Sequence, residues 1–436
     1  MMLDTIALTL EQHQFEILAP ERFSPSAVGL LRAPFYPLRA RAYFPCVLNP
    51  TKSDLAAGKY GPRLTLGRRK THGGFVTTLR IEFSAPKLLF GNNFDELCSR
   101  DFEDVLANLH GHLTGCGVRV TDPVLRAAHA SAVHYGKNIA FSDFTNCSMV
   151  MHELDLIDLS GRFDLSQTDY RNEGHAIRYH TNDFELTFYD KMKDLQRAAI
   201  SDKRSVERDT IIQRDLFHDC GAYLKELEVL RMEVRLGSRR RITSILKKLR
   251  IEIEPTFAAL FDQSIAKEVL LHFWSGVRRQ IAVAPAPSET GPEALFARLA
   301  MANARKTRPG KLLQMLGGAM LVRSVGYRGA AALLQRHCSA RSWQRYKREL
   351  KQLPTQATPG FTALRRVDES LAAFETLRLD NFRVRDFRCT VESLEGRGRA
   401  LRAADSPSIS DHHQPKVAPA RQSGRARARA AAKNKE

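Results

Sequence analysis

The sequence of 436 residues contains no uninterrupted apolar run near the roughly 18 residues that a membrane-spanning helix needs. Residues 1–4 lack the basic and then apolar layout of a secretory signal peptide, so we expect neither secretion nor membrane insertion. The seven cysteines are scattered and form no C-x-x-C pair, which argues against a disulfide framework and a structural zinc site. We therefore expect a cytoplasmic protein with reduced thiols.

The sequence also lacks the common catalytic signatures, and its basic residues outnumber its acidic residues. The sequence has no phosphate-binding loop, HExxH helix or GxSxG turn. Its 67 Lys+Arg outnumber 48 Asp+Glu, and the formal net charge of +19 favours a polyanionic partner, most often nucleic acid. The low-complexity segment 401–436 carries only +5 of this charge. We expect this segment to be a disordered basic tail, because it has too little apolar surface to order itself.

Alternating, β-branched segments dominate the chain up to about residue 237. We expect strands at 5–10, 75–83, 130–139 and 227–236, a hairpin of 175–180 with 184–189, and helices at 102–113 and 146–159. After Ser238, a candidate helix cap, the pattern is mostly helical, with a Pro-rich linker at 282–292. The predicted fold class is α+β: an antiparallel-sheet domain over 1–237, a helical region over 238–400, and the tail.

One candidate nucleophile stands at the end of the predicted hairpin. Tyr189 closes the second strand, and Lys191 follows two residues later. A cation there would favour the phenolate and neutralise a scissile phosphate. Alternation also puts two basic residues and one acidic residue of a later strand on one face: Arg231, Glu233 and Arg235. From these residues alone, an ordinary strand-end tyrosine and a solvated ladder of ion pairs are the simpler interpretations.

Several short segments, taken in their order along the chain, carry a family resemblance. They are LDTIALTL (3–10), FSAPKLLFGNN (83–93), VHYGKN (133–138), LTFYDK (186–191), LRMEVR (230–235), VGY (325–327) and SWQRY (342–346). Together they resemble the filamentous-phage gene II replication initiators and related phage and plasmid rolling-circle initiators. Each match is loose, and the order of the set gives it specificity.

The resemblance implies a metal-dependent, site-specific DNA nicking and closing enzyme that starts rolling-circle replication. Tyr189 would attack the scissile phosphorus, leaving a 5′-phosphotyrosine and a free 3′-hydroxyl for a polymerase. Glu82 and Glu233 would be hard oxygen ligands for Mg²⁺ or Mn²⁺. His134 is a minor ligand candidate, and His129 is an alternative to it.

Two basic clusters predict contacts with DNA. The first, at the start of the helix after Ser238, would contact the phosphate backbone: Arg239, Arg240 and Arg241. The second lies in a possible helix-turn-helix over about 330–350, where four side chains would face phosphates or a groove: Arg341, Arg345, Lys347 and Arg348. An amphipathic helix pair with a solvated basic face explains the second pattern equally well.

The expected partner is origin DNA, duplex beside the nick and single-stranded at it, together with a host helicase and polymerase. An oligomer at the origin is compatible with this expectation. A plasmid-transfer relaxase is a rival, although the sequence lacks a clustered three-histidine motif and a helicase loop. A non-catalytic DNA-binding repressor is another, and predicts binding without scission. An RNA-binding protein would need an aromatic stacking signature that the basic strands lack.

Overall fold

The computed structural model describes residues 3–32, 43–71, 74–141, 143–159, 169–171, 174–201, 209–219, 227–281, 291–302, 308–334, 336–351 and 361–379. Residues 1–382 form one compact unit. The tail predicted at 401–436 and nearly all of the predicted linker at 282–292 lie outside the described residues.

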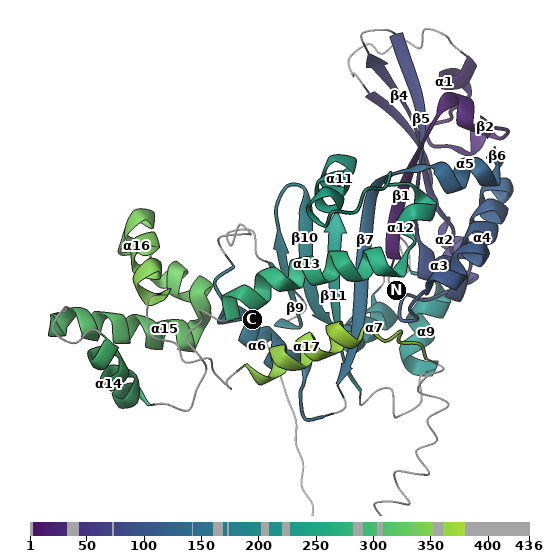
Figure 1. Cartoon of the computed structure of the whole chain (residues 1–436). Coiled ribbons are helices and arrows are strands. Elements are labelled where there is room, and N and C mark those ends of the chain that lie inside the picture. The colour runs from purple at the N-terminus through teal and green to yellow at the C-terminus, as the bar shows by residue number, and fades with distance from the viewer. Residues whose placement is uncertain are drawn as a thin grey trace, which may run out of the picture. The chain divides into compact units, whose positions relative to one another are not determined.

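A nine-stranded antiparallel sheet forms the centre of the described chain (Figure 1). In spatial order its strands are β3 (Tyr43–Leu48), β4 (Arg63–Thr71), β5 (Gly74–Ser84), β1 (Leu3–Glu11), β7 (His129–Phe141), β11 (Glu228–Leu236), β10 (Phe184–Asp190), β9 (Ala176–His180) and β8 (Asp169–Arg171). Two short strands, β2 (Glu16–Ile17) and β6 (Val118–Arg119), pair separately. The predicted α+β class is confirmed.

Helices lie between and after the strands. They are α1 (Val28–Arg32), α2 (Lys52–Ala56), α3 (Ala85–Phe90), α4 (Phe102–Gly115), α5 (Asp122–Ala127), α6 (Cys147–Asp155), α7 (Lys191–Ile200), α9 (Ile211–Asp219), α11 (Arg239–Lys248), α12 (Phe257–Leu260), α13 (Gln263–Ile281), α14 (Pro292–Ala302), α15 (Pro309–Leu334), α16 (Ala340–Lys351) and α17 (Thr362–Ala373). The expected Ser238 cap is present, because its hydroxyl accepts a hydrogen bond from the Arg241 backbone N–H at 3.2 Å.

One face of the sheet is apolar and packs on helices. Leu230, Met232 and Val234 of β11 point to this face and are completely buried. α13 and α17 cross it in Figure 1, and the Trp274 ring of α13 meets the Phe188 ring of β10 edge-on. The hydrophobic core therefore continues across residue 237, where the sequence suggested the end of a domain.

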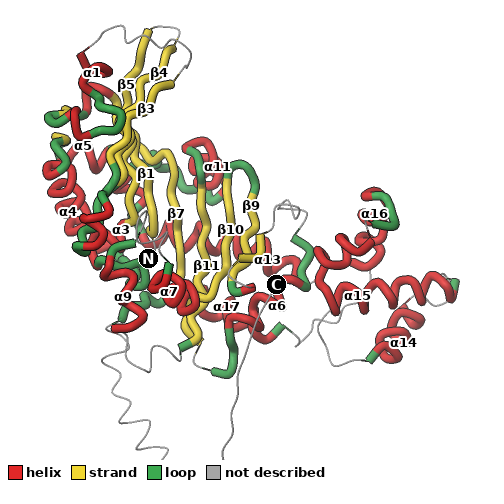
Figure 2. The backbone as a smooth tube through the Cα atoms, turned by 180° about the vertical axis from the view of Figure 1, so that it is seen from behind, coloured by secondary structure: helices red, strands yellow, loops and turns green. Residues whose placement is uncertain are grey.

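The opposite face of the sheet carries polar side chains and faces the viewer in Figure 2. α7 and α9 cover one end of it, through a small apolar cluster that includes Leu195, Leu216 and Val229. The strands beyond that cluster present charged residues, among them Arg178, Glu185 and Arg235. This half-covered polar face positions the candidate site.

Candidate functional site

Tyr189 lies on the polar face, beside β11. Its backbone pairs with Arg231 of β11. Glu233, two residues further along β11 and on the same face, is therefore its diagonal neighbour. The Tyr189 hydroxyl donates a hydrogen bond to Glu233 Oε1 at 2.7 Å. The phenol therefore has a carboxylate directly in front of its proton.

Glu233 is almost completely buried and is held by two guanidinium groups. Its Oε1 accepts from Arg231 Nε at 2.8 Å, and its Oε2 accepts from Arg235 Nη2 at 2.8 Å. Burial alone would raise the pKa of Glu233, but the charges of Arg235 and Arg231 outweigh it and hold this pKa well below its usual range. Glu233 is thus an ionised carboxylate within the fold, and not part of a solvated ladder.

The pKa of the Tyr189 phenol shifts in the direction opposite to that of Glu233. Burial raises it well above its ordinary value, and the negative charge of Glu233 adds to this effect while Arg231 opposes it. Tyr189 therefore keeps its proton at neutral pH. Its conversion to a nucleophile requires transfer of that proton during the reaction.

Arg231 connects the site to three other parts of the chain. Its guanidinium lies 2.8 Å from Asp4 Oδ1 on β1, 3.0 Å from Asn138 Oδ1 on β7 and 3.2 Å from the Asn93 carbonyl oxygen. Gly136 on β7 makes room for it, since a Cβ at that position would lie 2.8 Å from Arg231 Nη2. The orientation of Arg231 therefore depends on a glycine.

Arg235 extends the ion network across the sheet. Its Nη1 lies 2.7 Å from Glu185 Oε1 on β10, and Arg178 Nε on β9 lies 2.6 Å from Glu185 Oε2. Alternating positive and negative side chains thus cross three neighbouring strands. Guanidinium groups also bind phosphate in a bidentate manner. A bound phosphate can therefore replace a carboxylate as the partner of these arginines.

Lys191 approaches the same place from the start of α7. The side chain is completely buried, and Nζ donates to Asn93 Oδ1 at 2.7 Å and lies 5.9 Å from the centre of the Tyr189 ring. Burial, followed by the Arg231 charge, lowers the pKa of Lys191 to about 8. The structure thus brings together three of the predicted residues: Tyr189, Lys191 and Glu233.

The other two predicted metal ligands, Glu82 and His134, lie on the same sheet face, but among the described residues they form no three-ligand group with Glu233. Glu82 on β5 accepts a hydrogen bond from Arg80 at 3.0 Å, and β1 separates it from β7. His134 on β7 pairs with Arg235 in register, and burial together with the Arg235 charge lowers its pKa. Since the Glu233 oxygens already bind two cations, this donor set does not fit Mg²⁺ or Mn²⁺.

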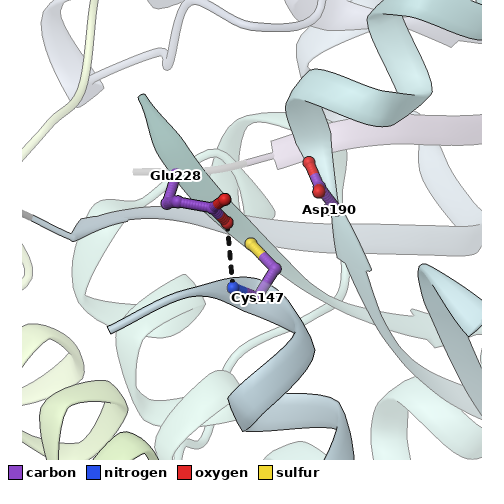
Figure 3. A group of neighbouring side chains, drawn as sticks. All are labelled: Cys147, Asp190 and Glu228. Atoms are coloured by element: carbon purple, nitrogen blue, oxygen red, sulfur yellow. Dashed lines mark hydrogen bonds between the residues drawn. The ribbon is translucent and has the colours of Figure 1, made fainter. Parts of the chain in front are cut away.

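Among the described residues, one group of side chains could hold a metal ion: Cys147, Asp190 and Glu228 (Figure 3). Glu228 accepts the Cys147 backbone N–H at 2.9 Å, and Asp190 accepts the Lys193 backbone N–H at 2.9 Å. Each carboxylate therefore also caps the first turn of a helix. Alternation puts Asp190 and Glu228 on the apolar side of the sheet, opposite the Tyr189 hydroxyl.

The predicted DNA-contacting arginines occupy two helices. Arg239 and Arg240 are exposed on the first turn of α11, whereas Arg241 is half-buried and lies over the Phe184 ring. On α16, Arg345 and Arg348 are exposed. Lys347 does not face outward as expected, because its side chain is buried and its Nζ lies 3.5 Å from Asp158 Oδ2.

Sequence reasoning missed the residues that hold Arg231 and Arg235 in place. They are Asp4, Asn93, Asn138, Arg178 and Glu185. Glu185 had a usable signal, since it alternates with Tyr189 on β10. Asp4, Asn93 and Asn138 lie in segments that carry the family resemblance, but their contacts with Arg231 were not predictable, because these contacts form only when distant segments fold together.

Comparisons with known proteins add no relative. No protein-family model matches the chain, and no curated protein or solved structure matches it significantly. None of the helices in the described part of the chain combines the length and the apolar character needed to cross a bilayer.

Proposed function

We propose that this chain is a site-specific DNA nicking and closing enzyme that starts rolling-circle replication, with Tyr189 as its nucleophile. The observation that carries the proposal is the 2.7 Å hydrogen bond from the Tyr189 hydroxyl to Glu233, on a sheet face with several guanidinium groups. A nucleophile within hydrogen-bond reach of a base is the arrangement that covalent catalysis needs. The positive net charge of +19 supports a polyanionic substrate.

In the proposed reaction, Tyr189 Oη attacks the scissile phosphorus while its proton passes to Glu233 Oε1. The bond from phosphorus to the 3′ oxygen breaks, so the 5′ phosphate stays on the tyrosine. The departing 3′ oxygen takes a proton from water and becomes a hydroxyl. Attack by a 3′-hydroxyl on the phosphotyrosine reverses these steps and closes the strand.

Arrival of the DNA phosphate would also activate the base. In the free protein, Arg235 and Arg231 keep the pKa of Glu233 low, so it is a weak base. A phosphate competes for these guanidinium groups, because it accepts the same paired hydrogen bonds as a carboxylate. Losing part of this pairing raises the basicity of Glu233. Lys191, whose pKa of about 8 leaves it mainly protonated at neutral pH, adds positive charge beside the phosphate.

We route no step through Mg²⁺ or Mn²⁺, because guanidinium groups occupy both Glu233 oxygens. The metal requirement implied by the sequence resemblance stays a prediction. It is measured by supplying metal-stripped protein with buffer alone, Mg²⁺ or Mn²⁺ and comparing the yield of nicked circles. The origin DNA, the host helicase and polymerase and the cytoplasmic site of action belong to the same proposal.

The decisive experiment uses supercoiled DNA that carries a candidate phage or plasmid intergenic region. We expect open circles and a protein–DNA adduct that survives denaturant, and we expect Tyr189→Phe to abolish both. Tyr327→Phe is the matched control, since the buried Tyr327 hydroxyl has no hydrogen-bond partner among the described residues. Nicking and adduct formation by Tyr189→Phe would refute the nucleophile. Binding without scission in every metal condition would favour the non-catalytic repressor.

A further inference from the structure

The helices α14, α15 and α16 share a hydrophobic core of their own. It contains Leu299, Leu312, Met315, Ala319, Val322, Tyr327, Ala330, Trp343 and Leu350. Gly318 of α15 lets α16 approach closely, because a Cβ there would overlap the Tyr346 ring. These helices therefore form a packed module, and each has a buried and an outer side.

The end of this module has the layout of a helix-turn-helix. α15 is interrupted at Gly326, whose φ of 70° and ψ of 170° break the helix and leave a short second part that ends at Leu334. The His337 and Cys338 backbone N–H groups bond to the Leu334 carbonyl at 2.9 and 2.8 Å. The Ser339 hydroxyl then accepts the Ser342 N–H at 3.2 Å, which caps the start of α16. Two helices joined by a tight turn are the framework of this DNA-binding motif.

The outer side of α16 carries a single stripe of exposed polar residues. They stand at helical spacing: Arg341, Gln344, Arg345 and Arg348. The opposite side is fixed in place by Trp343 and Leu350, and by the buried ion pair of Lys347 with Asp158. None of the four stripe residues is acidic. The nearby Glu349 lies outside the stripe and pairs with Lys311.

We propose that α16 is a recognition helix that enters the major groove of duplex DNA and reads base edges with Gln344 and Arg345. This inference rests on the proposed function in one respect, which is the choice of DNA as the partner. Glutamine bonds in a bidentate manner to adenine, and arginine to guanine, in the major groove. Arg341 and Arg348, at the two ends of the stripe, bind flanking phosphates.

Duplex DNA fits this stripe better than single-stranded DNA or RNA. Binding of single strands depends on exposed aromatic rings on which bases stack, whereas Trp343 is buried and the Tyr346 hydroxyl donates to the Gln314 carbonyl. The major groove of an RNA helix is too deep and narrow for an α-helix to read, while that of B-DNA admits one.

The test is selection by the full chain from a library of duplexes with a randomised centre. We expect one enriched sequence, and we expect Gln344→Ala to weaken binding to it on the order of tenfold while leaving affinity for random duplex unchanged. Gln344 is exposed and its replacement by Ala changes no charge, so we expect the variant to fold. An unchanged unfolding midpoint would show that it does. Arg365→Ala, which removes an exposed charge from α17, is the control and should select the same sequence.

Two results would overturn the inference. One is the lack of any enriched sequence, and the other is selection of the wild-type sequence with undiminished affinity by both Gln344→Ala and Arg345→Ala. Tyr189→Phe separates this inference from the nicking proposal. It should select the same sequence as the wild type, so loss of nicking alone leaves the reading of duplex DNA standing.

Discussion

At the scale of single residues, the buried Glu233 carboxylate accepts hydrogen bonds from two guanidinium groups and one phenol. Its two oxygens accept hydrogen bonds from Arg231, Arg235 and Tyr189. A buried ion network of this kind tolerates the loss of one partner poorly, because the remaining charges stay buried without compensation. The same carboxylate is the proposed proton acceptor, so its stability role and its chemical role need separate measurements.

Replacing Glu233 by Gln should therefore destabilise the fold by about 3 kcal/mol, since two buried guanidinium groups lose their counter-charge. Urea unfolding of the full chain measures this change. Glu82→Gln is the comparison, because Glu82 is partly exposed in its pair with Arg80 and should cost less than about 1 kcal/mol. Equal losses for both variants would contradict the view of Glu233 as the centre of a buried network.

Lys191 should make stability depend on pH in the alkaline range. Its pKa is about 8 in the folded protein, while an unfolded lysine holds its proton up to about pH 10.4. Between these values the unfolded state binds more protons, so the contribution of Lys191 to stability rises with pH.

Compared with Lys191→Met, the wild type should therefore gain about 2–3 kcal/mol between about pH 8 and 10. Parallel urea titrations at several pH values measure the difference between the two proteins. The comparison cancels the titration of Tyr189 and of other groups that the two proteins share. A difference that does not change over this range would show that Lys191 keeps an ordinary pKa.

At the scale of helices and strands, regular patterns were predictable and long-range partners were not. The strands expected at 5–10, 75–83, 130–139 and 227–236 are confirmed as parts of β1, β5, β7 and β11. α6 ends at Asp155, earlier than expected, and β4 (Arg63–Thr71) was missed because its basic residues hide the alternation of Leu64 and Leu66. Tyr189 and Glu233 could be placed on strands, but their contact depends on the β10–β11 register.

The pairing of β7 with β11 gives a test of the position of Arg231. Gly136→Ala would put a Cβ 2.8 Å from Arg231 Nη2, so the guanidinium must move away from Glu233 and Asp4. We expect a loss of about 1–3 kcal/mol in stability, as for other overpacked sites, together with reduced nicking.

Gly111→Ala on α4 is the control for this change. A Cβ there meets no described residue within 4 Å, and alanine favours a helix by up to about 1 kcal/mol over glycine. Thermal unfolding and the plasmid assay measure both variants. Unchanged stability and nicking in Gly136→Ala would show that Arg231 does not need its present position.

At the scale of the whole described chain, residues 377–379 form hydrogen bonds with the loop around residues 93–96, which borders the site. Glu96 exchanges backbone and side-chain hydrogen bonds with Leu377, and Asp95 Oδ1 accepts the Leu379 N–H at 2.6 Å. A few residues earlier, Asn93 contacts both Lys191 and Arg231. Residues 377–379 therefore support the candidate site from outside it.

A chain shortened to residues 1–382 should unfold like the full chain, because it keeps this segment. A chain shortened to 1–374 should lose about 1–3 kcal/mol, since the buried Glu96 carboxylate and its neighbours lose hydrogen-bond partners. Hydrogen exchange at residues 93–101 measures the local effect. Equal protection of this loop in both shortened chains would show that the segment contributes nothing to it.

The contact between Glu96 and Leu377 also sets an order of events during synthesis. The two residues are 281 positions apart, so their hydrogen bond cannot form until nearly all of the described chain has left the ribosome. Contacts of such long range close late in folding, because they carry the largest loop-closure entropy. A nascent chain would thus expose Tyr189, Glu233 and Arg235 well before the segment that completes their surroundings has been made.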